Sequence, residues 1–129
     1  MAEQQPTVVI IEDDVTWSKM LPEFVEPYPV IVLRTLSEAL DFINTQSQAI
    51  EEQRVNVVAF IVDGNLTEDA RGGAEGEMLI EIIRKKSAFD SANIISNSGG
   101  NKLAGADFHA KKKEEGLAKL PEWIGAKRV

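Results

Sequence analysis

The sequence predicts a single α/β domain built on a doubly wound parallel sheet, with five strands in the order 2-1-3-4-5. Short apolar segments alternate with segments whose apolar residues recur at helical spacing, which is the pattern of strand–helix–strand units. The longest apolar run, VVAFIV at residues 57–62, is unbroken and rich in β-branched side chains, as in a strand buried on both faces. A chain of 129 residues suits one domain with one core.

The expected elements alternate regularly after a loose tail at residues 1–6. Polar residues mark the helix starts: Asp14 is a candidate cap of the first helix, and Ser37 is the expected N-cap of the second. We expect strands at residues 8–11, 30–33, 57–62, 93–96 and 106–110, and helices at residues 16–25, 37–53, 75–86 and 117–124.

The segment between the last two strands is short. Only ten residues, 97–106, join them, and three of these are glycines. A helical crossover between parallel strands needs at least about ten to twelve residues. The fourth helix of the fold is therefore expected to be short or absent.

Composition excludes several classes of function. The net charge of -7 and the pI near 4.7 argue against a nucleic-acid surface. The absence of cysteine excludes disulfides and thiolate chemistry, and the single histidine, His109, excludes a histidine-cluster metal site. We interpret His109 as a strand residue with no special role. No apolar run is long enough for a membrane span and no signal peptide is evident, so we expect a cytoplasmic protein.

Carboxylates follow two of the predicted strands. Glu12 and Asp13 come directly after the first strand, and Asp63 comes directly after the third. In the order 2-1-3-4-5 these strands are neighbours, and their carboxyl ends meet at the edge where such sheets bind ligands. Three carboxylates at one edge repel one another and favour a hard cation, of which Mg²⁺ is the expected one. The backbone carbonyl of Asn65 is a further candidate ligand.

A hydroxyl and a cation are expected at the same edge. Ser96 ends the fourth strand, with Ser98 as a second choice, and Lys111 opens a run of three lysines at residues 111–113 after the fifth. A metal beside a carboxylate allows that carboxylate to attack a phosphoryl group. Ser96 and Lys111 would then bind oxygens of a phosphoryl group on Asp63.

These segments resemble the receiver domain of bacterial two-component response regulators, a flavodoxin-like fold. VVIIEDD is similar to that family's first strand with its acidic pair, AFIVDGNL to its phosphoacceptor strand, and GEMLIEIIR to the start of its third helix. IIS is similar to its strand-4 hydroxyl segment and DFHAK to its strand-5 lysine segment. The resemblance makes residues 1–129 a single receiver domain, and it places Phe108 at an aromatic position that often responds to phosphorylation.

The resemblance also implies a role for each site residue. Asp63 becomes the phosphorylated residue, with Ser96 and Lys111 as its phosphate partners. A histidine kinase or a histidine phosphotransfer protein becomes the donor, and a downstream protein becomes the target. The domain would catalyse its own phosphorylation and slow hydrolysis without being a conventional enzyme. Glu12 and Asp13 become the metal carboxylates, so the expected metal ligands are Glu12, Asp13, Asp63 and Asn65.

The chain departs from the family pattern in ways that leave alternatives open. Lys112 replaces the proline that follows the family's lysine, which leaves open which of the three lysines contacts phosphate. Asn97 replaces a small residue beside the hydroxyl. The first hypothesis is a stand-alone phosphoacceptor that signals by protein–protein interaction. The alternative is a pseudo-receiver that binds proteins without phosphorylation. A dehalogenase-type hydrolase needs a second acid where this chain has Asn65.

Overall fold

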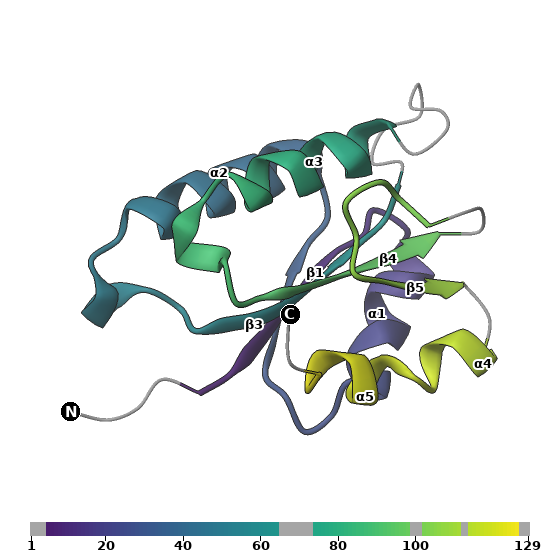
Figure 1. The fold of residues 1–129 in the computed structure, drawn as a ribbon. Coiled ribbons are helices and arrows are strands. Elements are labelled where there is room, and N and C mark those ends of the chain that lie inside the picture. The colour runs from purple at the N-terminus through teal and green to yellow at the C-terminus, as the bar shows by residue number, and fades with distance from the viewer. Residues whose placement is uncertain (1–4, 65–73, 99–101, 112–113, 127–129) are drawn as a thin grey trace.

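The computed structural model describes residues 5–64, 74–98, 102–111 and 114–126, and it contains the predicted sheet (Figure 1). All neighbouring strands are parallel, and the order β2-β1-β3-β4-β5 confirms the predicted order. The strands are β1 (Thr7–Ile11), β2 (Val30–Leu33), β3 (Val57–Val62), β4 (Asn93–Ser98) and β5 (Phe108–Lys111).

The register between strands brings the carboxyl ends of β1, β3 and β4 to one edge of the sheet. Ile11 pairs with Val62, and Val62 pairs with Ser96. Glu12 and Asp63 each follow the last residue of such a pair, so they leave the sheet side by side. The fold therefore positions the predicted acidic residues through strand register, although about 50 residues of sequence separate them.

One helix follows each of the first three strands, as predicted, but the caps and ends of these helices differ from the prediction. Asp14 caps the first helix by accepting a hydrogen bond from the Trp17 amide (3.0 Å). The second helix is capped by Thr35 and not by Ser37, because the Thr35 hydroxyl accepts from the Glu38 amide (3.0 Å). The helices are α1 (Val15–Phe24), α2 (Leu36–Gln48), α3 (Ala74–Arg84), α4 (Glu114–Leu117) and α5 (Leu120–Ile124), with 3-10 turns at Glu51–Gln53 and Ser87–Phe89.

Two of these helices correct the prediction. The second helix ends at Gln48, and the following residues form the separate turn Glu51–Gln53. The single C-terminal helix expected at residues 117–124 is two short helices, α4 and α5, with Pro121 in the first turn of α5. No helix among the described residues is long and apolar enough to cross a lipid bilayer.

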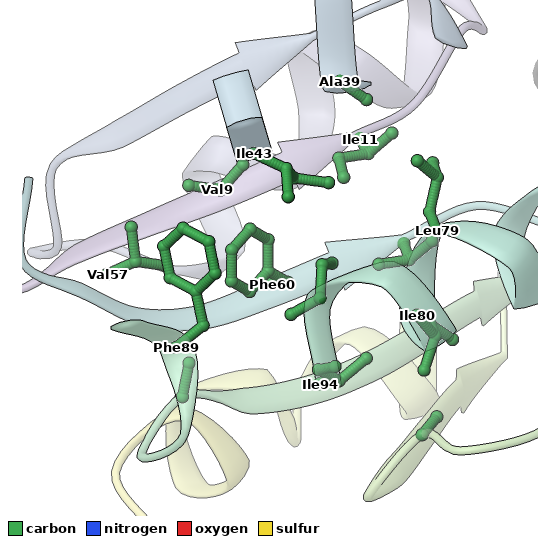
Figure 2. Packing of buried hydrophobic residues seen from close by; sticks show 14 of the residues in the cluster. Val9, Ile11, Ala39, Ile43, Val57, Phe60, Leu79, Ile80, Phe89 and Ile94 are labelled. Atoms are coloured by element: carbon green, nitrogen blue, oxygen red, sulfur yellow. The ribbon is translucent and has the colours of Figure 1, made fainter. Parts of the chain in front are cut away.

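The sheet separates two apolar cores. One core lies between the sheet and helices α2 and α3, where Phe60 meets Phe89 edge to face with ring centroids 5.2 Å apart (Figure 2). The other core joins the opposite face of the sheet to α1, α4 and α5. Val9 and Ile11 enter the first core while Val8 and Ile10 enter the second, as expected for a strand covered on both faces.

The connection from β4 to β5 packs against α3 without forming a helix in its described part, residues 102–107, in agreement with the expected short or absent fourth helix. Leu103 and Ala106 are buried in the core beneath α3. Gly105 adopts a φ of 86°, which other residues rarely adopt, and this lets the chain turn back towards β5.

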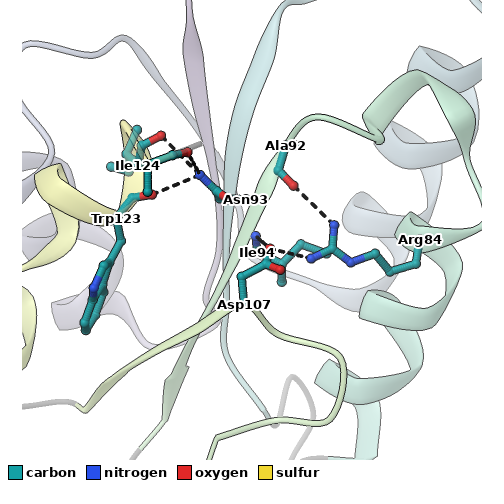
Figure 3. Close-up of polar contacts among 8 residues, drawn as sticks. Arg84, Ala92, Asn93, Ile94, Asp107, Trp123 and Ile124 are labelled. Atoms are coloured by element: carbon teal, nitrogen blue, oxygen red, sulfur yellow. Dashed lines mark hydrogen bonds and ion pairs between the residues drawn. The ribbon is translucent and has the colours of Figure 1, made fainter. Parts of the chain in front are cut away.

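Polar anchors hold β4 from both of its faces (Figure 3). The Asp107 carboxylate accepts hydrogen bonds from the Ile94 amide (2.8 Å) and from Arg84 of α3 (2.5 Å). On the other face, the Asn93 side chain donates to the carbonyls of Trp123 (3.0 Å) and Ala126 (2.7 Å) at the end of α5. These contacts fix the β4–β5 pair relative to the helices on both sides.

Replacing Asp107 tests the anchor on the α3 side. The substitution Asp107→Ala leaves Arg84 and the Ile94 amide without this acceptor, and we expect a loss of about 1–3 kcal/mol in the free energy of unfolding. The control is Lys85→Ala, which breaks an exposed pair with Glu81 on α3 and should cost less than about 0.5 kcal/mol. Urea denaturation measures both, and equal losses would contradict an anchoring role for Asp107.

Candidate functional site

Three carboxylates form a compact cluster at the carboxyl edge of the sheet. Glu12, Asp13 and Asp63 each offer one oxygen, and these oxygens lie within 4.8 Å of one another. The exposed fraction is 1% for Glu12 and 7% for Asp63, while Asp13 is half-buried. The structure thus brings together the three acidic residues that the sequence selected. Asn65, the fourth predicted ligand, lies outside the described residues.

The backbone around Asp63 is fixed by hydrogen bonds on both sides. Its amide donates to the Ile11 carbonyl (2.9 Å), which continues the β1–β3 ladder beyond the last strand pair. Its Oδ1 accepts a hydrogen bond from the Gly64 amide (2.8 Å). The Glu12 amide donates to the Leu33 carbonyl of β2 (3.0 Å). The backbones of Glu12 and Asp63 are therefore held to the neighbouring strands at this edge.

This crowding gives the cluster its chemistry. Two unit charges at this separation repel by about 3–4 kcal/mol at an effective dielectric constant of about 20, and burial adds a desolvation cost. A divalent cation offsets both terms. The donor set is entirely oxygen and combines carboxylates from two neighbouring strands, which suits Mg²⁺ better than a softer metal. The residues present therefore fit a hard divalent cation.

Helix α3 begins in direct contact with the backbone of the cluster. The Gly76 amide donates to the Gly64 carbonyl (2.9 Å). A β-carbon at position 76 would lie 2.5 Å from the Asp63 carbonyl oxygen and 2.8 Å from a methyl group of Leu103. Gly76 lies in the first turn of α3. Only glycine permits this close approach of α3 to the edge.

Ser96 is completely buried and its hydroxyl is bonded to a histidine. Within the described residues, its Oγ has two partners, His109 Nδ1 at 2.6 Å and the Leu103 amide at 3.3 Å. The Leu103 amide can only donate. If His109 Nδ1 also donated, the buried hydroxyl proton would be left without an acceptor, at a cost of about 1–3 kcal/mol. The arrangement therefore favours donation from the Ser96 hydroxyl to His109 Nδ1.

The proposed phosphate lysine lies at the end of β5. Lys111 is exposed and pairs with Ser98 of β4, one residue pair beyond Asn97 and Ala110. The alternation of the strand places Lys111 and His109 on the face opposite Ala110, which is buried among α1 and α5 residues. Lys112 and Lys113, the other two candidates, lie outside the described residues.

Phe108 and Asn97 are the strand neighbours of the Ser96–His109 pair, Phe108 before His109 on β5 and Asn97 after Ser96 on β4. Phe108 lies flat against Trp123 of α5, with ring centroids 5.3 Å apart and an angle of 8° between the rings. Its ring therefore faces α5, and His109 is the β5 side chain that meets Ser96. Asn97 is 1% exposed and its amide nitrogen donates to the Ala110 carbonyl (2.9 Å). Its bulk is thus buried immediately after Ser96, on the strand beside Asp63.

His109 is the residue that sequence reasoning undervalued. From the sequence we assigned it no special role, whereas the structure places its ring against Ser96, a predicted site residue. The signal that could have found it is alternation: in the segment DFHAK, His109 shares a strand face with Lys111 and not with Phe108. The pairing of Ser96 with His109 depends on the β4–β5 register, which the sequence does not specify.

Comparisons with known proteins match this fold to solved structures of receiver domains. No family model and no curated relative matches the chain. A CheY-like response regulator receiver domain from Methanospirillum hungatei is 22% identical, with 94% of each chain covered and a TM-score of 0.68. The chain has the receiver-domain fold.

Two further receiver structures match over nearly the whole chain. The phosphorylated cyanobacterial phytochrome response regulator RcpA is 13% identical, covering 98% of this chain and 100% of its own, with a TM-score of 0.71. The receiver domain of a Pseudomonas aeruginosa sensor histidine kinase, with a magnesium ion in its active-site cleft, is 17% identical, with coverages of 96% and 100% and a TM-score of 0.69. At these identities the likeness establishes the receiver fold alone.

A methyl group at position 76 tests the close contact between α3 and the acidic edge. Alanine favours a helix by up to about 1 kcal/mol over glycine, but overpacking against fixed backbone atoms typically costs about 1–3 kcal/mol. We expect Gly76→Ala to lower the free energy of unfolding in urea.

The matched control for this substitution is Gly125→Ala. A β-carbon at position 125 would meet no atom closer than 3.7 Å, and its φ of -83° suits any residue. We expect a change within about 0.5 kcal/mol. A Gly76→Ala protein as stable as the Gly125→Ala protein would show that α3 does not press on the Asp63 backbone.

Proposed function

We propose that this chain, residues 1–129, is a single receiver domain of the response regulator family that accepts a phosphoryl group on Asp63. The observation that carries the proposal is the cluster of Glu12, Asp13 and Asp63 at the carboxyl edge of the receiver fold. A structural cap or turn would explain one such carboxylate, and Asp14 is an example. Capping does not explain three carboxylates from two strands directed at one point.

The proposed donor is the phosphohistidine of a histidine kinase or of a histidine phosphotransfer protein. An Asp63 carboxylate oxygen attacks the phosphorus, the nitrogen–phosphorus bond breaks as the oxygen–phosphorus bond forms, and the donor imidazole takes up a proton. Glu12, Asp13 and Asp63, with the carbonyl of Asn65, would hold Mg²⁺. Mg²⁺ supplies charge neutralisation, so that an anionic carboxylate and an anionic phosphoryl group can approach each other.

Ser96 and Lys111 are the proposed partners of the phosphoryl oxygens. Ser96 follows from the β3–β4 register, since it pairs with Val62, the residue before Asp63. Lys111 lies at the end of the adjacent strand β5. A hydroxyl and an ammonium group both donate hydrogen bonds to phosphoryl oxygens, and the lysine adds a positive charge. Their approach to the new oxygens would transmit phosphorylation to β4 and β5.

The proposed output is a change in binding to a downstream protein in the cytoplasm. The net charge of -7 does not suit a nucleic-acid partner. Among the matched receivers, one is a phosphorylated regulator and one holds magnesium in its active-site cleft. Those two states are the ones that we propose for this chain.

A second function is a pseudo-receiver that binds a protein partner without phosphorylation. Asn97 favours it, because this side chain is buried directly after Ser96 on the strand next to Asp63 and takes up room beside the acceptor. Residues 102–107 also form no helix, so this part of the β4–β5 connection lacks the fourth helix that could move on phosphorylation. The two functions differ in whether Asp63 is chemically modified.

Phosphorylation by a small donor separates the two functions. With acetyl phosphate or phosphoramidate and Mg²⁺, we expect intact mass spectrometry to show one phosphoryl adduct on the wild-type protein. Asp63→Asn should abolish the adduct, since an amide is not a nucleophile for this reaction. Chelating Mg²⁺ with EDTA should also abolish it.

The matched control is Asp14→Asn, a carboxylate replaced on the neighbouring loop. Asp14 lies outside the cluster and caps α1, and asparagine caps helices about as well as aspartate. This variant should keep the adduct. An unmodified wild-type protein, or an adduct that persists in Asp63→Asn, would reject Asp63 as the acceptor and favour the pseudo-receiver.

A further inference from the structure

The hydroxyl of Ser96 already has an acceptor. It is fully buried, and its Oγ lies 2.6 Å from His109 Nδ1 and 3.3 Å from the Leu103 amide nitrogen. A hydroxyl carries one proton and can donate it to one acceptor at a time. A phosphoryl group on Asp63 that is to bind the Ser96 hydroxyl must therefore compete with His109 for the same proton.

We propose that His109 is a positioning residue for phosphorylation at Asp63. In the unphosphorylated protein, His109 accepts a hydrogen bond from the Ser96 hydroxyl, and it releases this hydroxyl when phosphoryl oxygens arrive. The inference rests on the proposed function, because it concerns the Ser96 hydroxyl as a phosphate ligand. His109 itself touches neither Mg²⁺ nor phosphate in this account. It acts through the 2.6 Å hydrogen bond to Ser96.

His109 can release the Ser96 hydroxyl because either of its two ring nitrogens can carry the proton of the neutral imidazole. In the unphosphorylated protein, Nδ1 accepts from Ser96, so the ring carries its proton on Nε2. After release, Nδ1 carries a proton and donates to Ser96 Oγ, alongside the Leu103 amide. The Ser96 proton then points at the phosphoryl oxygen. Solvent, which the half-exposed ring can reach, supplies the Nδ1 proton and takes up the Nε2 proton, so the ring changes tautomer and keeps its charge.

Phe108 provides the contrast on the same strand. Its ring is stacked on Trp123 on the α5 side, whereas His109 lies on the side of Leu103 and the α3 core. A substitution at Phe108 therefore perturbs β5 without touching the Ser96 hydrogen bond. This makes Phe108→Leu a control for general effects on β5.

Nitrogen-15 spectra of the imidazole ring test the inference directly, because the chain has only one histidine. The probe is beryllofluoride with Mg²⁺, a stable mimic of the phosphoryl group. We expect Nδ1 to be an unprotonated acceptor in the free protein and to become protonated when beryllofluoride is bound. Ser96→Ala should remove the free-protein hydrogen bond and the response to the probe.

A second variant separates positioning from packing. Phe108→Leu perturbs β5 on the side of α5 without touching the Ser96 hydrogen bond. It should therefore keep the wild-type response of the His109 Nδ1 signal to beryllofluoride.

The outcomes distinguish this inference from the proposed function. Failure of the wild-type protein to bind beryllofluoride rejects the phosphoacceptor function and the inference with it. Binding that leaves the His109 Nδ1 signal unchanged, or an Nδ1 response that persists in Ser96→Ala, overturns the inference and leaves the phosphoacceptor function standing.

Discussion

The mutual repulsion of three carboxylates at one rigid edge is the constraint on which the site depends. The oxygens of Glu12, Asp13 and Asp63 lie within 4.8 Å, and two of the residues are almost fully buried. Buried charges of one sign are stable only when an opposite charge or a proton accompanies them. The Asp63 amide donates to the Ile11 carbonyl and its Oδ1 accepts from the Gly64 amide, and these two hydrogen bonds hold its carboxylate at this edge. The edge is therefore preorganised for a cation.

The rest of the fold keeps this edge in place and connects it to the surface. Gly76 allows α3 to rest on the Asp63 backbone, and Leu103 of the β4–β5 connection packs against the same point. The Leu103 amide also contacts Ser96, whose hydroxyl reaches His109 on β5. A change at Asp63 thus has a path of direct contacts to the edge strand. That path runs through hydrogen bonds and needs no helix between β4 and β5.

The fold and the acidic cluster were predictable because they follow from the apolar pattern of short stretches of sequence. Unbroken apolar runs such as residues 57–62 define buried strands, and the rule for parallel sheets then brings Asp63 beside Glu12. The errors concern interactions that several elements decide together. Thr35 rather than Ser37 caps α2. His109, to which we assigned no role from the sequence, meets Ser96, because the β4–β5 register sets this contact.

Binding of Mg²⁺ to the folded protein tests the central claim most directly. Urea unfolding at increasing Mg²⁺ should show wild-type stability rising, by about 2.7 kcal/mol at one hundred times the dissociation constant. Asp63→Asn should be more stable than wild type without Mg²⁺, because one repelling charge is gone, and should gain less from the ion. A wild-type stability that does not respond to Mg²⁺, or an equal response in both proteins, would contradict the account.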